Sequence, residues 1–135
     1  MLDHLGLDVT DYERSKAFYE RALAPLRIGL VMEPVHGVGG FGDGGKPYFW
    51  IGRRDRPPQT GVHVAFAASS RDQVDAFHAA ALAAGASDNG GPGVREIYHP
   101  DYGAFVLDPD GNNVEAVCHT PADTRSHASR AVITR

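Results

Sequence analysis

With 135 residues, 42% of them hydrophobic, the chain is long enough for one compact domain and too short for several. Its net charge of −4 and its scattered Lys and Arg residues argue against binding to nucleic acid or to an anionic membrane, which requires a basic face. The first residues carry neither a basic start nor a long apolar run, and no stretch approaches the roughly 20 apolar residues of a membrane span, so we expect a cytoplasmic protein.

The N-terminal segment shows a strand pattern followed by a helix pattern. Residues 5–9 alternate apolar and polar side chains, which is typical of a strand with one face on a core. Thr10 and Asp11 are suited to cap a helix, and apolar residues then recur at helical spacing. We therefore predict one strand and one helix, with Pro25 closing the helix.

Short apolar runs at residues 28–32 and 48–51 predict further strands in the first half of the chain. The glycine-rich stretch 37–45 lies between them, and we interpret residues 40–46 as a flexible loop at the rim of a cleft. The first half is thus predicted to have the order β-α-β-β-β.

The second half repeats this order after a proline-rich connector at residues 56–58. Residues 62–66 alternate like a strand, and two serines precede a helix predicted over 71–84, with Gly85 as its stop. Three more strands are predicted at 94–98, 104–107 and 114–118. A turn at residues 108–111 joins the last two of these strands.

An offset of 59 residues superimposes the two halves. It places His63 on His4, Phe77 on Phe18 and Leu82 on Leu23. Matched apolar positions are common among amphipathic helices, but the match of two histidines in equivalent strands is more specific. The sequence therefore indicates a duplicated β-α-β-β-β module.

The two equivalent histidines are candidate metal ligands. In both first strands the large apolar residues have the opposite parity, so His4 and His63 should face away from the helix. Their neighbours Gly6 and Ala65 are small, which leaves room for a concave site. In the last strand, Glu115 has the parity opposite to its buried neighbours and supplies a carboxylate.

A set of two imidazoles and one carboxylate leaves coordination positions open for water or substrate. Because Cys118 is the single cysteine, a Cys-rich zinc site is excluded, and Fe, Mn, Ni or Zn would depend on His4, His63 and Glu115. The alternative is that each histidine is an ordinary hydrogen-bonded strand residue and Glu115 a solvated carboxylate.

Four segments of the sequence, residues 2–9, 15–19, 62–66 and 108–115, resemble the vicinal oxygen chelate superfamily. Its members include glyoxalase I, fosfomycin-resistance transferases, extradiol dioxygenases and bleomycin-resistance proteins. The resemblance covers roughly residues 1–120. Because this scaffold serves isomerisation, thiol addition, ring cleavage and simple binding, the resemblance specifies a superfamily rather than a reaction.

The resemblance implies an α+β fold of two tandem β-α-β-β-β modules, whose curled sheets form a metal-containing cleft. We expect a single domain over residues 1–121, with modules at 1–57 and 58–121 and a C-terminal tail at 122–135. It also implies one divalent metal ion, a small-molecule substrate that chelates it through neighbouring oxygens, and a homodimer. The site is completed either within one chain or across the dimer.

Glyoxalase I-like members usually take a fourth ligand from the last strand of the first module, and here residues 48–51 contain no carboxylate. The three-ligand pattern resembles the dioxygenase-like and fosfomycin-type branches instead. The resemblance therefore implies a metal-dependent enzyme acting on a small oxygen-rich metabolite, with dioxygenase-like or glyoxalase/lyase-like chemistry. The alternatives are a bleomycin-resistance-type protein that sequesters a drug or metabolite, and a non-catalytic partner subunit.

Further side chains are candidates for the same cleft. Besides Glu115, His99 and Tyr102 are candidate catalytic residues, because they immediately precede a strand that should line the cleft and could carry protons. Phe49 and Trp50 are candidates for an apolar wall against the substrate. For all four the alternative is a structural role.

Overall fold

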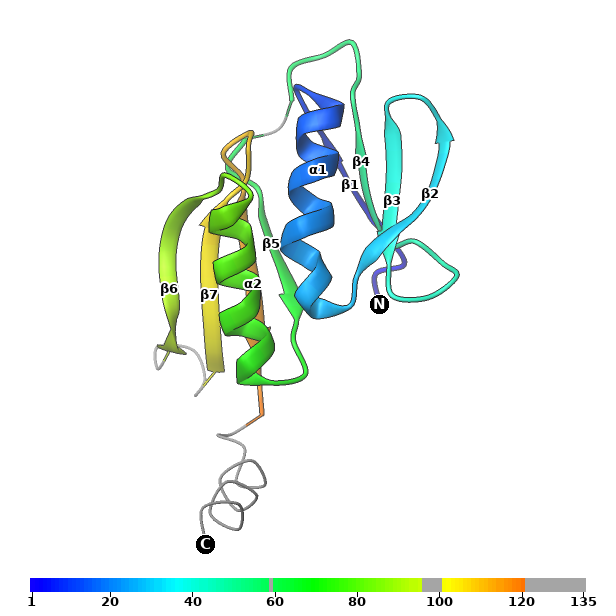
Figure 1. Ribbon diagram of the computed structural model, residues 1–135. Coiled ribbons are helices and arrows are strands. Elements are labelled where there is room, and N and C mark those ends of the chain that lie inside the picture. The colour runs from blue at the N-terminus through cyan, green and yellow to red at the C-terminus, as the bar shows by residue number, and fades with distance from the viewer. Residues whose placement is uncertain (59, 96–100, 121–135) are drawn as a thin grey trace, which may run out of the picture.

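The computed structural model describes residues 1–58, 60–95 and 101–120, which form two modules lying side by side (Figure 1). Each module consists of a four-stranded sheet with a helix packed on one of its faces. Helices α1 and α2 lie next to each other, and the Arg21 guanidinium at the end of α1 donates to the Ala83 carbonyl at the end of α2. Within the described residues, neither helix is both long and apolar enough to cross a lipid bilayer.

The first module contains five regular elements and a short 3-10 helix. They are β1 (Leu5–Asp8), α1 (Tyr12–Leu23), η1 (Ala24–Leu26), β2 (Gly29–Val35), β3 (Val38–Gly42) and β4 (Phe49–Gly52). The strand order is β1-β4-β3-β2, with β1 parallel to β4 and the other pairs antiparallel. As expected, Asp11 caps α1, accepting a hydrogen bond from the Arg14 backbone N–H.

The second module repeats this arrangement. It contains β5 (His63–Ala67), α2 (Arg71–Ala83), β6 (Ser87–Arg95), β7 (Asp101–Leu107) and β8 (Asn113–Cys118). The order β5-β8-β7-β6 matches that of the first sheet, and α1 and α2 begin 59 positions apart, at Tyr12 and Arg71. The predicted α+β fold of two tandem β-α-β-β-β modules is therefore confirmed. The sheets are curled but not closed.

The expectation that residues 40–46 form a loop was wrong for the first three of them, because β3 extends to Gly42. A Cβ atom at Gly39 would lie 2.6 Å from the Tyr12 hydroxyl, and one at Gly42 would lie 2.5 Å from the Lys46 carbonyl oxygen. The glycines of β3 thus allow neighbouring groups to approach the strand closely.

Strand β6 begins earlier than predicted. The expected strand at 94–98 is preceded by regular pairing from Ser87 onward, and residues 96–98 lie outside the described residues. The segment has no apolar alternation, and its register shifts on either side of Gly90, which has a φ of 144°. A bulged, polar edge strand lacks the periodicity on which sequence-based prediction depends.

The apolar core occupies the face of each sheet that its helix covers. In the first module Phe18, Tyr19 and Leu23 of α1 pack with Leu7 and Ile51 of the sheet, and all five are at most 3% exposed. The second module is built in the same way. Its fully buried apolar side chains are Val74, Phe77 and Ala81 of α2 and Ala104, Val106, Val114, Ala116 and Cys118 of the sheet. The opposite faces carry His4 and Trp50 in the first module and His63 and Glu115 in the second.

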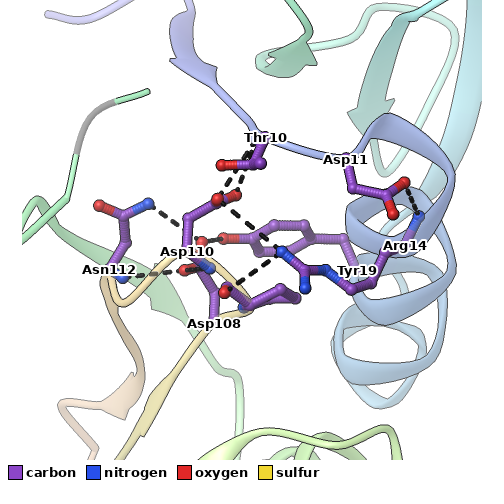
Figure 2. Close-up of polar contacts among 8 residues, drawn as sticks. Thr10, Asp11, Arg14, Tyr19, Asp108, Asp110 and Asn112 are labelled. Carbon is purple, nitrogen blue, oxygen red and sulfur yellow. Dashed lines mark hydrogen bonds and ion pairs between the residues drawn. The ribbon is translucent and has the colours of Figure 1, made fainter. Parts of the chain in front are cut away.

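A polar cluster connects the turn between β7 and β8 to the first module (Figure 2). The Tyr19 hydroxyl of α1 donates to Asp108 Oδ2 at 2.5 Å, and both side chains are at most 5% exposed. Asp108 Oδ1 accepts from the backbone N–H groups of Asp110 and Asn112 at 2.9 and 2.8 Å. The Thr10 backbone N–H in turn donates to the Asp110 carboxylate at 3.2 Å. The predicted turn is present, and it also holds the two modules together.

Candidate functional site

The parallel pairing of β5 with β8 brings His63 and Glu115 together. Ala65 of β5 pairs with Glu115 of β8. His63 precedes Ala65 by two residues, so its side chain lies on the same face of the sheet as Glu115. His63 Nε2 lies 2.8 Å from Glu115 Oε1. The imidazole is 53% exposed and the carboxylate 12% exposed, so solvent or a ligand reaches the pair from the imidazole side.

Strand β7 supplies the surroundings of the Glu115 carboxylate. Glu115 is opposite Phe105, and a Cβ atom at Gly103 would lie 3.2 Å from Glu115 Oε2. The Phe105 ring lies 6.1 Å from the His63 ring. The absence of a side chain at Gly103 thus gives the carboxylate its room, while Phe105 forms an apolar border.

An imidazole nitrogen and a carboxylate oxygen on one face are a suitable donor set for Mn, Fe, Ni or Zn. The His63–Glu115 contact has the length of a hydrogen bond. A cation bound by both atoms would take the place of the shared proton, because metal ligands must be deprotonated. The chemistry of this pair therefore fits two ligands of a divalent metal.

His4 is not brought to this pair within one chain. It precedes β1 on the open side of the first sheet, is exposed, and its Nδ1 lies 2.7 Å from Asp3 Oδ1. In residues 1–58, 60–95 and 101–120, no group of three or more His, Cys, Asp or Glu side chains is arranged to hold a metal ion. The structure thus assembles two of the three candidate ligands.

Trp50 occupies in the first sheet the position that Glu115 occupies in the second. Trp50 pairs with Gly6 of β1, and Glu115 pairs with Ala65 of β5, which is the equivalent of Gly6 at the 59-residue offset. Trp50 is half-buried on the open face, between the buried residues Phe49 and Ile51. The first sheet therefore presents an aromatic ring where the second presents a carboxylate.

The remaining candidate residues lie elsewhere. Phe49 is 1% exposed in the core, with its ring 4.9 Å from that of Tyr19. Tyr102 extends toward α2, where its hydroxyl donates to Asp75 Oδ1 at 2.6 Å, and this hydrogen bond raises the pKa of the phenol. Both side chains are thus on helix-covered faces, opposite to that of Glu115. His99 lies outside the described residues.

A charged group on the open face of the first sheet was not anticipated from the sequence. Asp8 at the end of β1 is 5% exposed, and its two carboxylate oxygens contact Nε of Arg54 at 3.2 Å and Nε of Arg56 at 2.5 Å. Hydrogen bonding to Asp8 raises the pKa of Arg56. One sequence signal could have located Asp8 on this face. Asp8 has the same parity along the strand as His4 and Gly6.

Comparison with known proteins identifies the family of this chain. The family model of the Glyoxalase/Bleomycin resistance protein/Dioxygenase superfamily matches residues 1–116. The chain belongs to this superfamily. No curated protein matches the chain.

Solved structures of the superfamily are similar over almost the whole chain. A glyoxalase/bleomycin resistance protein from Albidiferax ferrireducens T118 is 33% identical, with a TM-score of 0.77 over 89% of this chain and 99% of that one. A lactoylglutathione lyase from Agrobacterium tumefaciens is 17% identical, with a TM-score of 0.64 and coverage of 87% and 92%. TioX from Micromonospora sp. ML1 is 19% identical, with a TM-score of 0.65 and coverage of 89% and 99%. The last two likenesses show the shared fold alone.

Proposed function

We propose that this superfamily member is a divalent-metal-dependent enzyme acting on a small oxygen-rich metabolite. The observation that carries the proposal is the contact of His63 Nε2 with Glu115 Oε1 at 2.8 Å on the open face of the second sheet. Two such donors from adjacent strands leave most coordination positions of a metal available to water, substrate and a third protein ligand.

The proposed third ligand is His4, supplied by a second copy of the chain. His4 is exposed on the open side of the first sheet, and the described residues of one chain form no three-ligand group. Homodimers are common in the superfamily, and a dimer that placed one copy's first sheet opposite the other's second sheet would complete the set. Until metal displaces it, Asp3 keeps the His4 ring hydrogen-bonded through Nδ1.

Within such a site the residues of this chain have distinct roles. A bound divalent cation would supply positive charge that stabilises negative charge developing on substrate oxygens. His63 and Glu115 hold the cation, and Phe105 excludes water from one side of the pair. Trp50 provides an apolar surface for the substrate. Dioxygenase-like and glyoxalase/lyase-like reactions both fit this arrangement.

The second candidate is sequestration of a drug or metabolite without catalysis. It is favoured by the first sheet, where Trp50 stands in the place of a carboxylate and faces a hollow of about 590 Å³. A protein of this kind would bind its ligand equally well without metal.

Turnover with and without metal distinguishes the two candidates. The protein is stripped with chelator, reloaded separately with Fe(II), Mn, Ni or Zn, and assayed for ring cleavage of catechols and for isomerisation of the glutathione–methylglyoxal adduct. We expect turnover that requires metal and is lost in His63→Ala and Glu115→Gln. His119→Ala is the matched control, since it removes a 2.8 Å imidazole–carboxylate contact with Asp101 at the surface. Metal-independent ligand binding with no turnover in either assay favours sequestration.

A further inference from the structure

The open face of the first sheet has an unusual row of side chains across three strands. Trp50 of β4 lies between Gly6 of β1 and Gly40 of β3, both of which pair with it in register. An indole ring flanked by glycines on both sides stands on a flat backbone surface. The next residue on this row is Met32 of β2, which pairs with Gly40.

The Trp50 ring lies over Gly40 and leaves the Gly6 side open. A Cβ atom at Gly40 would lie 2.9 Å from Cη2 and Cζ3 of Trp50 and 2.8 Å from Cβ of Pro47. A Cβ atom at Gly6, by contrast, would meet nothing closer than Trp50 Cβ at 3.9 Å. The ring is therefore confined on one side and accessible on the other.

The hollow beside the ring has the size and lining of a small-molecule site. Its volume is about 590 Å³, within the range of roughly 300–1,000 Å³ that is typical of ligand pockets. Its apolar lining consists of Met32, Val38, Pro47 and Trp50, and its polar lining consists of Asp3, His4, Lys46 and Arg54. Met32 is 45% exposed, although an unbranched thioether is well suited to packing against an aromatic ring. These apolar groups favour a planar, ring-containing ligand.

The polar end of this face carries an excess of positive charge. Asp8 is a single buried carboxylate shared by two guanidinium groups, those of Arg54 and Arg56, and both contact it through Nε. A smaller hollow of about 120 Å³ is lined by all three residues and shares Trp50 and Arg54 with the larger one. Arg54 therefore lines both hollows and Arg56 lines the smaller one, and the two guanidinium groups carry one more charge than the Asp8 carboxylate that they share.

We propose that the open face of the first sheet binds a planar aromatic molecule that carries a carboxylate. The ring stacks beside Trp50 against Met32, and the carboxylate accepts hydrogen bonds from the Arg54 guanidinium, whose fork matches a carboxylate in shape. This inference rests on the proposed function, because it names the substrate class for that site. Binding through Trp50, Met32 and Arg54 does not require metal, although His4, the proposed third metal ligand, lines the same hollow.

The test uses the fact that Trp50 is the single tryptophan of the chain. Metal-free protein is titrated with 4-nitrobenzoate, whose nitroaromatic ring quenches indole emission on contact, and with the uncharged 4-nitrobenzamide, with calorimetry alongside. We expect saturable quenching by both and an affinity about tenfold higher for the acid, the value of one charge-assisted hydrogen bond.

Three variants locate the charge that recognises the acid. Arg54→Gln should lower the affinity for the acid about tenfold and leave that for the amide unchanged, while Arg54→Lys keeps most of the preference. Arg53→Gln is the matched control, because Arg53 lines a different hollow with Thr10 and His36. Urea unfolding of each variant establishes that the fold is intact.

Several results would overturn the inference. These are quenching that does not saturate at millimolar ligand, equal affinity for acid and amide, or an equal effect of Arg53→Gln. Emission that shifts with protein concentration but not with ligand would instead show that a second copy covers this face. The titration is repeated with His63→Ala. This variant should lose metal and keep the ligand affinity of the wild type. In the wild type, ligand binding without metal uptake contradicts the proposed function alone, whereas metal uptake without ligand binding contradicts only the ligand class.

Discussion

Trp50 and Glu115 hold the same position in two copies of one module, opposite Gly6 in the first and opposite Ala65 in the second. The sizes of their partners on the other neighbouring strand compensate: the large indole of Trp50 pairs with Gly40, and the smaller carboxylate of Glu115 pairs with Phe105. At this position the first sheet thus presents an indole ring, and the second presents a carboxylate beside the Phe105 ring. The two copies of the module therefore place different chemical groups at one equivalent position of the fold.

The close contact between Gly40 and Trp50 predicts that Gly40→Ala is destabilising. The added methyl group would lie 2.8–2.9 Å from Pro47 and the indole, so the ring must move. We expect a loss of about 1–3 kcal/mol in the free energy of unfolding, together with a shift in tryptophan emission. Gly29→Ala on β2 is the control, because a Cβ atom there meets nothing within 4 Å. Equal stability of the two variants would show that the indole does not rest on Gly40.

The buried hydrogen bond between Tyr19 and Asp108 predicts a second loss of stability. Tyr19→Phe removes a donor from a carboxylate that is 5% exposed, and an underpaired buried group costs about 1–3 kcal/mol. Tyr102→Phe deletes the hydroxyl that donates the solvent-exposed hydrogen bond to Asp75, and it should cost less than about 1 kcal/mol. Urea unfolding curves measure both. A cost for Tyr19→Phe no greater than that for Tyr102→Phe would contradict the role of the polar cluster.

The same tyrosine predicts a loss of stability in alkali. Burial, followed by the charge of Asp108, raises the pKa of Tyr19 well above its usual value of 10.0. Below pH 10 Tyr19 is protonated in both the folded and the unfolded state, so it does not make the free energy of unfolding depend on pH. Above pH 10 the unfolded state loses the proton while the folded state keeps it, so the free energy of unfolding falls by about 1.4 kcal/mol per pH unit.

Comparison of the wild type with Tyr19→Phe between pH 9 and 11 isolates this contribution. Tyr12, Tyr48 and Tyr102 also have raised pKa values and contribute to both proteins equally. The wild type should therefore lose stability more steeply than the variant above pH 10. Parallel curves would show that Tyr19 ionises as readily in the folded protein as in the unfolded chain.

The close approach of Gly103 to Glu115 predicts that Gly103→Ala weakens metal binding. In Gly103→Ala the new methyl group would lie 3.2 Å from Glu115 Oε2, which forces the carboxylate to shift by a few tenths of an ångström. We expect metal affinity to fall by about tenfold, as for other groups that orient a ligand. Gly91→Ala on β6 is the control, since nothing lies within 4 Å of a Cβ atom there. Calorimetric titration with Zn measures both variants, and unchanged affinity in Gly103→Ala would argue against Glu115 as a ligand.

The sequence was sufficient to predict most of the fold. Helical spacing, the cap at Asp11 and the stop at Gly85 located both helices, because these signals are local. Strand β3 was missed because its glycines are selected by long-range contacts, such as that of Gly39 with Tyr12, which no local pattern reveals. The early start of β6 was missed for a similar reason, since pairing with β7 outweighs a polar, glycine-rich sequence.

The site was partly predictable from strand parity. Parity and the duplicated histidines identified His63 and Glu115 as facing the same way, and the parallel register brings them into contact. Parity did not reveal which face of β4 and β7 the helices cover, so Phe49 and Tyr102 were placed beside Trp50 and Glu115 as candidates. The charged group around Asp8 depends on how the chain turns after β4, which periodicity does not encode.

The most direct test of the central claim is the metal content of the protein. Wild type, His63→Ala, Glu115→Gln and the control His119→Ala are purified in parallel, dialysed against trace-metal-free buffer and measured by elemental analysis. We predict about one tightly held divalent metal ion per chain in the wild type and in His119→Ala, and loss of that metal in both ligand variants. Equal and negligible metal in all four proteins would contradict the claim that His63 and Glu115 form part of a metal site.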